Sequence, residues 1–97
     1  KSGLFDLATA FETVYFWPGP VKSFMEVNRI LKENGIFMIV NESDGTGRYD
    51  EKWSRCIDGM HIYRGKQLAG YLKEAGFREV ILNHYIDIHR LCIIAKK

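Results

Sequence analysis

Two runs of apolar residues separated by a helical pattern constrain the fold of this chain more than any other feature. Residues 4–11 (LFDLATAF) and residues 36–40 (IFMIV) are almost continuously apolar, which is typical of strands buried on both faces of a sheet. Between them, apolar side chains recur at helical spacing over residues 21–31. A crossover of this length joins parallel strands with a right-handed connection. The sequence therefore predicts a strand–helix–strand unit of an α/β fold.

Residues that restrict the backbone flank the predicted helix. Pro18 and Gly19 interrupt regular secondary structure. Pro20 suits the first turn of a helix because that position needs no N–H donor. Asn34 and Gly35 follow the helical pattern. We expect them to end the helix, with Gly35 in the left-handed conformation.

The second half of the chain predicts two more helices and a hairpin. Apolar residues at helical spacing predict a short amphipathic helix over residues 49–57 and another helix over residues 66–75. Residues 80–88 alternate in the manner of a half-exposed strand, and residues 91–95 are apolar again. The gap around His89 is too short for a crossover, so these two strands should pair antiparallel.

Composition limits the class of protein. The chain has 97 residues, enough for one domain, with 46% hydrophobic residues and a net charge of +2. Its apolar runs are far shorter than the roughly 20 residues of a membrane span. The small charge does not favour nucleic acid or an anionic membrane surface as a partner. No signal peptide is visible, so a cytoplasmic location is expected. Cys56 and Cys92 each have an apolar neighbour and are predicted to pack as reduced cysteines.

The loop at residues 45–50 (GTGRYD) nearly matches the dinucleotide-binding fingerprint Gly-x-Gly-x-x-Gly. Asp50 replaces the third glycine, and Glu42 and Asp44 lie close by in sequence. These acidic residues would repel a pyrophosphate, which requires free N–H groups at a helix N-terminus. The alternative is a flexible polar loop that starts a helix.

The histidines do not predict a metal centre. His61, His84 and His89 lack the spacing of metal ligands on one helix face, and no pair of cysteines lies near them. His84 shares a predicted strand face with apolar residues, so it is interpreted as a packed or edge histidine.

Four aromatic residues within residues 11–17 (FETVYFW) follow the carboxyl end of the first predicted strand. Ligands bind outside that end in open α/β sheets, so these rings and Glu12 could form a wall for a flat or cationic ligand. Alternatively, Phe11, Tyr15 and Phe16 fill the core beneath the following helix.

The order of four segments resembles the class I S-adenosylmethionine-dependent methyltransferases. Residues 5–13 (FDLATAFET) resemble their fourth strand and the following loop. Residues 24–35 (FMEVNRILKENG) are similar to the segment R-v-L-k-p-G-G before strand five, with glutamate and asparagine in place of the usual proline and first glycine. Residues 72–77 (LKEAGF) match the L-x-x-A-G-F before the final hairpin, and residues 91–97 resemble the last strand. The resemblance covers almost the whole chain.

This resemblance implies a partial Rossmann-like methyltransferase sheet with flanking helices. Its strands would follow the family order 4-5-7-6, with the last strand antiparallel. Residues 1–97 would form the C-terminal half of a methyltransferase domain. The glycine-rich loop and the ribose-binding acid of the family's N-terminal, cofactor-binding half have no counterpart and would lie upstream of Lys1. The 97-residue fragment alone is therefore expected to be inactive.

The resemblance also implies methyl transfer from S-adenosylmethionine in the parent protein. Ala10, Phe11 and Glu12 match the segment that borders the cofactor. The residues that would lie toward a small-molecule acceptor are Tyr15, Trp17, Asn41, Glu42 and Trp53. Direct displacement at the sulfonium methyl can run on proximity and alignment, so no catalytic residue is assigned, although Glu12, Glu42 or Tyr15 could remove a proton. The alternative is a non-catalytic binding or assembly module that retains half of the fold.

An unpaired strand at residues 4–11 predicts self-association. Strand one of the family would pair along its outer side, and the stretch has one charged residue, Asp6, with no proline or lysine to protect an edge. A second copy could pair with it about a two-fold axis. We therefore expect a homodimer, with an interface at or near Leu4, Phe5, Leu7 and Phe11.

Overall fold

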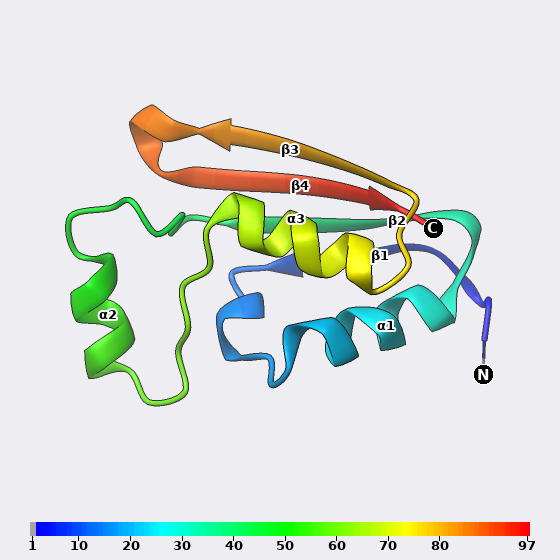
Figure 1. Cartoon of the computed structure of the whole chain (residues 1–97), viewed down its shortest axis with the longest axis horizontal. Helices are drawn as coiled ribbons and strands as arrows, with labels where there is room; N and C mark the ends of the chain where they lie inside the picture. Colours follow the sequence, from blue (N-terminus) through cyan, green and yellow to red (C-terminus); the bar gives the residue numbers. More distant parts are fainter. Residues whose placement is uncertain (1) are drawn as a thin grey trace.

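The computed structural model describes residues 2–97, which form a four-stranded sheet with helices on one face (Figure 1). The strands are β1 (Phe5–Phe11), β2 (Leu31–Asn41), β3 (Glu79–Tyr85) and β4 (Arg90–Lys96), in the order β1-β2-β4-β3. β1 pairs parallel with β2, and β4 pairs antiparallel with both β2 and β3. The predicted α/β class, strand order and antiparallel last strand are confirmed.

The carboxyl ends of β1, β2 and β3 lie at the same end of the sheet. Phe11 is opposite Val40, and both Asn41 and His84 are opposite Leu91. We call this end of the sheet the carboxyl edge. The loops that follow these three strands are therefore brought together there.

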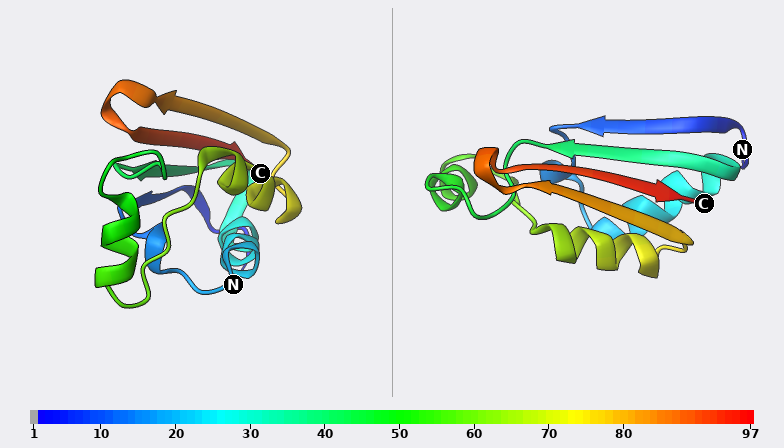
Figure 2. Two further views of the ribbon diagram at one scale, coloured as in Figure 1. Left: turned by 60° about the vertical axis from the view of Figure 1, so that its left-hand side comes forward. Right: turned by 90° about the horizontal axis from the view of Figure 1, so that it is seen from above.

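The helices occupy two positions relative to the sheet. Helices α1 (Pro20–Ile30) and α3 (Gly65–Glu74) cover one face, whereas α2 (Asp50–Cys56) extends beyond the carboxyl edge (Figure 2). Two short 3-10 helices, η1 (Val14–Phe16) and η2 (Ile86–Ile88), follow β1 and β3. The helices that cover the sheet therefore enclose the core on one side of it.

Phe37 of β2 lies at the centre of this core. Its ring centroid is 5.7 Å from that of Phe24 in α1 and 6.0 Å from those of Trp17 and Phe77. Buried aromatic rings in such contacts contribute a large share of core stability. The fully buried aliphatic residues around them include Leu31, Ile39, Leu68, Leu72, Leu91 and Ile93.

The opposite face of the sheet is uncovered within residues 2–97. Leu7, Phe11 and Ile81 are 56%, 55% and 53% exposed, and Val40 and Ile94 between them are half-buried. β1 is an edge strand of this sheet, as predicted. The sheet therefore presents apolar surface to solvent on one face and at one edge.

The end of α1 differs from the prediction. The helix stops at Ile30, and β2 begins directly at Leu31. The N–H groups of Gly3 and Leu4 donate to the carbonyls of Arg29 and Ile30, which a longer helix would use for its own hydrogen bonds. The segment just before β1 therefore occupies carbonyl groups that further turns of the helix would need.

The left-handed residue after α1 is Asn34, with φ of 66°, and not Gly35 as expected. Asparagine tolerates this conformation better than most residues. Gly35 is needed for another reason. A Cβ there would lie 2.8 Å from the carbonyl oxygen of Lys32 and 3.3 Å from that of Asp6. The backbone passes too close for any side chain at this position.

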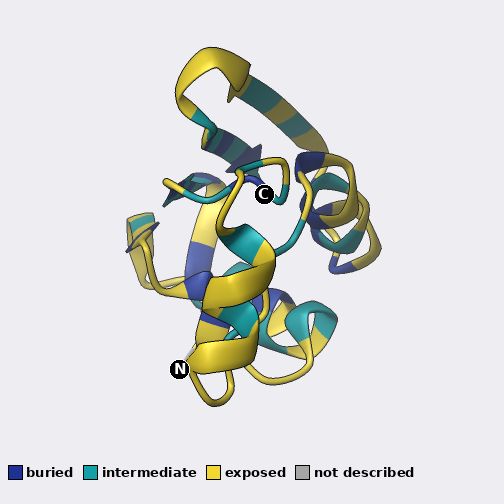
Figure 3. Ribbon diagram, turned by 90° about the vertical axis from the view of Figure 1, so that its left-hand side faces the viewer, coloured by how far each residue is buried: buried dark blue, intermediate teal, exposed yellow. Residues whose placement is uncertain are grey.

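The second predicted helix forms as α2, but its apolar side chains do not join the core. Tyr49, Trp53 and Ile57 are exposed, and Figure 3 shows exposed residues along this helix. Cys56 is also exposed, which contradicts its predicted packing, whereas Cys92 is half-buried in β4. Among residues 2–97, no helix combines the length and apolar character needed to cross a membrane.

The close approach at Gly35 predicts a specific loss of stability. Gly35→Ala should lower the free energy of unfolding by about 1–3 kcal/mol, because the new methyl group must displace backbone atoms. Gly70 in α3 is a matched control, since a Cβ there meets nothing within 4 Å. Gly70→Ala should raise stability by up to about 1 kcal/mol. Urea denaturation measures both, and an unchanged Gly35→Ala midpoint would contradict the close approach.

Candidate functional site at the carboxyl edge

Glu12 ties the ends of β1 and β2 together at the carboxyl edge. Its N–H donates to the carbonyl of Val40 at 2.8 Å, and its carboxylate accepts a hydrogen bond from the N–H of Glu42. The hydroxyl of Tyr15 donates to the same carboxylate at 2.7 Å, and the N–H of Ser43 donates to that hydroxyl at 2.9 Å. Glu12 adopts a φ of 58°, so its backbone turns sharply at this junction. The carboxylate of Glu12 thus links the loop after β1 to the loop after β2.

Tyr15 is buried at the centre of this network. Burial and the hydrogen bond to Glu12 raise the pKa of the Tyr15 hydroxyl, and the N–H of Ser43 only partly opposes this rise. The phenol therefore stays neutral near pH 7 and acts as a hydrogen-bond donor. A group with a raised pKa is a poor general base at this pH.

The other residues predicted to border the cofactor differ in accessibility. Ala10 is buried and offers only its backbone, whereas the ring of Phe11 is exposed. Phe16 is exposed as well. Of the two interpretations of the aromatic segment, core filling therefore holds for Tyr15 and fails for Phe11 and Phe16.

The residues predicted to face an acceptor are spread over three environments. Trp17 stacks on Phe37, with an interplanar angle of 5°, and packs against the core. Asn41 is fully buried, and neither polar atom of its amide has a hydrogen-bond partner within the described chain. Glu42 is exposed and pairs with Arg90 at 2.9 Å, and Trp53 is half exposed on α2. Tyr15, Glu42 and Glu12 are thus brought together, whereas Trp17 and Trp53 lie outside their network.

A second polar cluster at the same edge was not predicted from the sequence. The carboxylate of Asp44 is 1% exposed and lies 2.5 Å from Nε2 of His84 in β3. Its other oxygen accepts hydrogen bonds from the N–H and the hydroxyl of Thr46, at 2.8 and 2.6 Å. Nδ1 of His89 lies 2.9 Å from the same hydroxyl. β3 and the turn that contains η2 thus place two histidines next to a buried carboxylate.

The surroundings of Asp44 favour its charged form. Burial raises the pKa of this carboxyl group, but the hydrogen bonds from Thr46 and His84 outweigh burial and lower the pKa to about 2. Asp44 is therefore ionised at neutral pH, and its charge holds Thr46 and His84 in place.

The glycine-rich loop is occupied by a side chain of the protein itself. Oδ2 of Asp50 accepts hydrogen bonds from the N–H groups of Gly45 and Gly47, each at 2.9 Å. These are groups that a phosphate would need. The loop leads into α2, so the polar-loop interpretation fits the structure. In residues 2–97, no group of three or more His, Cys, Asp or Glu side chains could hold a metal ion.

Comparisons with known proteins place this geometry in a wider context. The family model of a methyltransferase domain matches residues 1–39. No curated protein matches the chain in sequence.

Solved structures match the whole fold. A SAM-dependent methyltransferase from Thermotoga maritima has 22% identity and a TM-score of 0.83, and the match covers 100% of this chain and 58% of that one. A methyltransferase in complex with the Haloferax volcanii Trm112 methyltransferase activator has 15% identity and a TM-score of 0.84, over 98% and 55%. PigF with SAH has 15% identity and a TM-score of 0.80, over 99% and 31%.

These likenesses confirm the fold that the sequence resemblance implies. The sheet and its helices match part of the Rossmann-like fold of SAM-dependent methyltransferases. The chain spans between about a third and three fifths of the length of these structures.

The ionised Asp44 predicts a pH-dependent contribution to stability. Its folded pKa of about 2 lies below the ordinary value of 3.8, so the contribution is complete above pH 4 and is lost as the pH falls toward 2. Asp44→Asn should lower the free energy of unfolding by about 2 kcal/mol at pH 7. Urea denaturation of both proteins at several pH values should show the difference shrinking below pH 4. A difference that stays constant to pH 2.5 would contradict the assignment.

Proposed function

We propose that these residues are part of a larger S-adenosylmethionine-dependent methyltransferase, in which they supply one wall of the cofactor site and part of the acceptor site. The observation that carries the proposal is the agreement of two comparisons: the methyltransferase family model matches residues 1–39, and the fold likeness extends over the whole chain. The uncovered sheet face and the free edge of β1 also suit a chain that packs against further polypeptide.

The residues present fit the cofactor as an apolar wall. The exposed ring of Phe11 offers a flat surface at the carboxyl edge, beside the backbone of Ala10. Glu12 borders this surface, but Tyr15 and Glu42 already occupy its carboxylate. Glu12 would therefore shape the wall and leave the cofactor's hydroxyl groups to residues elsewhere. When bound, S-adenosylmethionine would supply an activated methyl group on its sulfonium sulfur.

The chain's own residues would act by positioning. Glu12 and Tyr15 hold the loops after β1 and β2 at fixed places, which suits a transfer that depends on alignment. Trp53 and Glu42 are the predicted acceptor residues with exposed side chains, so they are available to a small-molecule acceptor. Trp17 and Asn41 would support this surface from within.

Cofactor binding tests the proposal in the longer protein. Phe11→Ala should weaken S-adenosylmethionine binding about tenfold, because an aromatic wall is lost. Trp53→Ala should instead raise the KM of the acceptor. Ile81→Ala, on the other edge strand, is a matched control that should change neither value. Titration calorimetry measures the affinities.

The 97 residues alone provide a further arm of that experiment. They should neither bind the cofactor tightly nor transfer a methyl group, because they supply one wall only. A dissociation constant in the low micromolar range for this chain would contradict the division into halves. Failure of the longer protein to bind the cofactor would favour a non-catalytic binding or assembly module.

The edge of β1 is the basis of a second proposal, a homodimer of the 97-residue chain. The N–H of Glu12 donates to β2, so the alternate N–H groups of Ala10 and Ala8 face β2 as well. The N–H of Thr9 points to the open side. Pairing with a second copy would satisfy such groups and cover Leu7 and its neighbours.

A charge at this edge should abolish the dimer. Leu7→Lys should give a monomer, because edge lysines oppose strand pairing, and Leu7 is exposed enough for the fold to tolerate it. Ile81→Lys makes the same change on the other edge strand and should remain dimeric. Sedimentation should give roughly twice 11.3 kDa for the unchanged chain. A monomeric unchanged chain, or equal dissociation by both variants, would overturn the proposed interface.

A further inference from the structure

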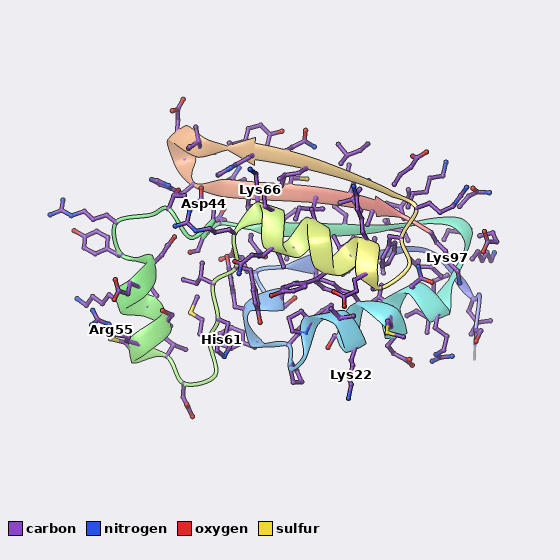
Figure 4. All side chains as sticks on the ribbon, in the orientation of Figure 1. Lys22, Asp44, Arg55, His61, Lys66 and Lys97 are labelled. Carbon is purple, nitrogen blue, oxygen red and sulfur yellow. The ribbon has the colours of Figure 1, made fainter. Side chains whose placement is uncertain are left out.

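A cavity of about 310 Å³ lies between the loop after β2, the start of α3 and β3. Its walls include Asp44 and Thr46 from the loop, Arg64 and Lys66 from the start of α3, and Leu82 and His84 from β3. Figure 4 shows Asp44 and Lys66 near the start of this helix. We call this cavity the α3 pocket. Its volume is at the lower end of the range for small-molecule sites.

Close packing fixes the position of the start of α3, which forms one wall of the α3 pocket. Gly65 is buried, and a Cβ there would lie 2.9 Å from Cδ1 of Leu82 and 3.2 Å from Cδ2 of Leu91. The first turn of α3 therefore rests directly on the β3–β4 hairpin. This contact keeps Arg64 and Lys66 beside His84 in β3.

The two cationic side chains in the wall of the α3 pocket are exposed and outnumber its one carboxylate. Neither Arg64 nor Lys66 forms an ion pair with a carboxylate among residues 2–97. Asp44 is the one carboxylate in the pocket wall, and its two oxygens are engaged by Thr46 and His84. Two cationic side chains thus remain without an anionic partner.

His84 adds an oriented polar group on the β3 side of the α3 pocket. Asp44 holds its Nε2, and its side chain is 31% exposed. No hydrogen bond to Nδ1 is formed within the described residues. The contact with Asp44 fixes the orientation of the ring, and Nδ1 is the ring nitrogen that remains for a ligand.

We propose that the α3 pocket binds the anionic group of a small molecule, a carboxylate or a phosphate. Lys66 and Arg64 supply the opposing charges, and the oriented ring of His84 forms the β3 side of the site. The start of a helix adds a favourable field for a negative group. The inference does not depend on methyl transfer, since it concerns a pocket formed by residues 44–84 alone.

Titration of the ¹⁵N-labelled 97-residue chain with inorganic phosphate and, separately, with acetate tests the proposal. Ionic strength is held constant with sodium chloride. At least one probe should shift the amide resonances of Thr46, Lys66 and His84 in a saturable manner. Saturation by phosphate alone assigns a phosphate group, and saturation by acetate assigns a carboxylate.

Matched variants separate the pocket from general surface charge. Lys66→Gln should weaken binding of the saturating probe about two- to fivefold. Lys73→Gln removes the same charge from the last turn of α3 and should leave the affinity unchanged. His84→Gln should also weaken binding, in a protein whose remaining resonances report an intact fold. Absence of saturable shifts with both probes, or an equal loss from Lys73→Gln, would overturn the proposal.

Discussion

The parallel pairing of β1 with β2 determines where every candidate residue of this chain lies. Because Phe11 is opposite Val40, the residue after β1 comes beside the loop after β2. The carboxylate of Glu12 can then accept the N–H of Glu42, and Tyr15 can reach both loops. A slip of one residue would exchange the two faces of β1 and remove this arrangement.

The sequence predicted the elements whose pattern is local. The apolar run of β1, the helical spacing of α3 and the alternation of β3 each report their own structure, and the short gap at His89 required a hairpin. The end of α1 was predicted wrongly because it is not decided locally. The carbonyls of Arg29 and Ile30 are taken by Gly3 and Leu4, far away in sequence. A pattern of side chains contains no record of this competition.

The candidate site likewise combines features that a local pattern predicts with features that depend on residues distant in sequence. The order of strands placed Phe11, Glu12 and Glu42 at one edge, since the carboxyl ends of parallel strands meet there. The pairing of Asp44 with His84 joins residues 40 apart and depends on the register of β3 against β4, so spacing could not indicate it. The helical spacing of α2 correctly showed an apolar side on a helix. It could not show that Trp53 and Ile57 would stay exposed, because that depends on what packs against them.

The acidic residues of the carboxyl edge explain how one loop can disfavour an anion while a neighbouring cavity favours it. Glu12 is held by Tyr15 and by backbone N–H, and Asp50 closes the glycine-rich loop from within. A phosphate at that loop would have to displace a carboxylate that is already hydrogen-bonded. Asp44 stays ionised, but both of its oxygens are engaged by Thr46 and His84, and it forms no ion pair with Arg64 or Lys66 among the described residues. The acidic sequence around residues 42–50 is therefore evidence against a phosphate at the loop itself, whereas in the adjacent pocket the two cations remain in excess over the single carboxylate.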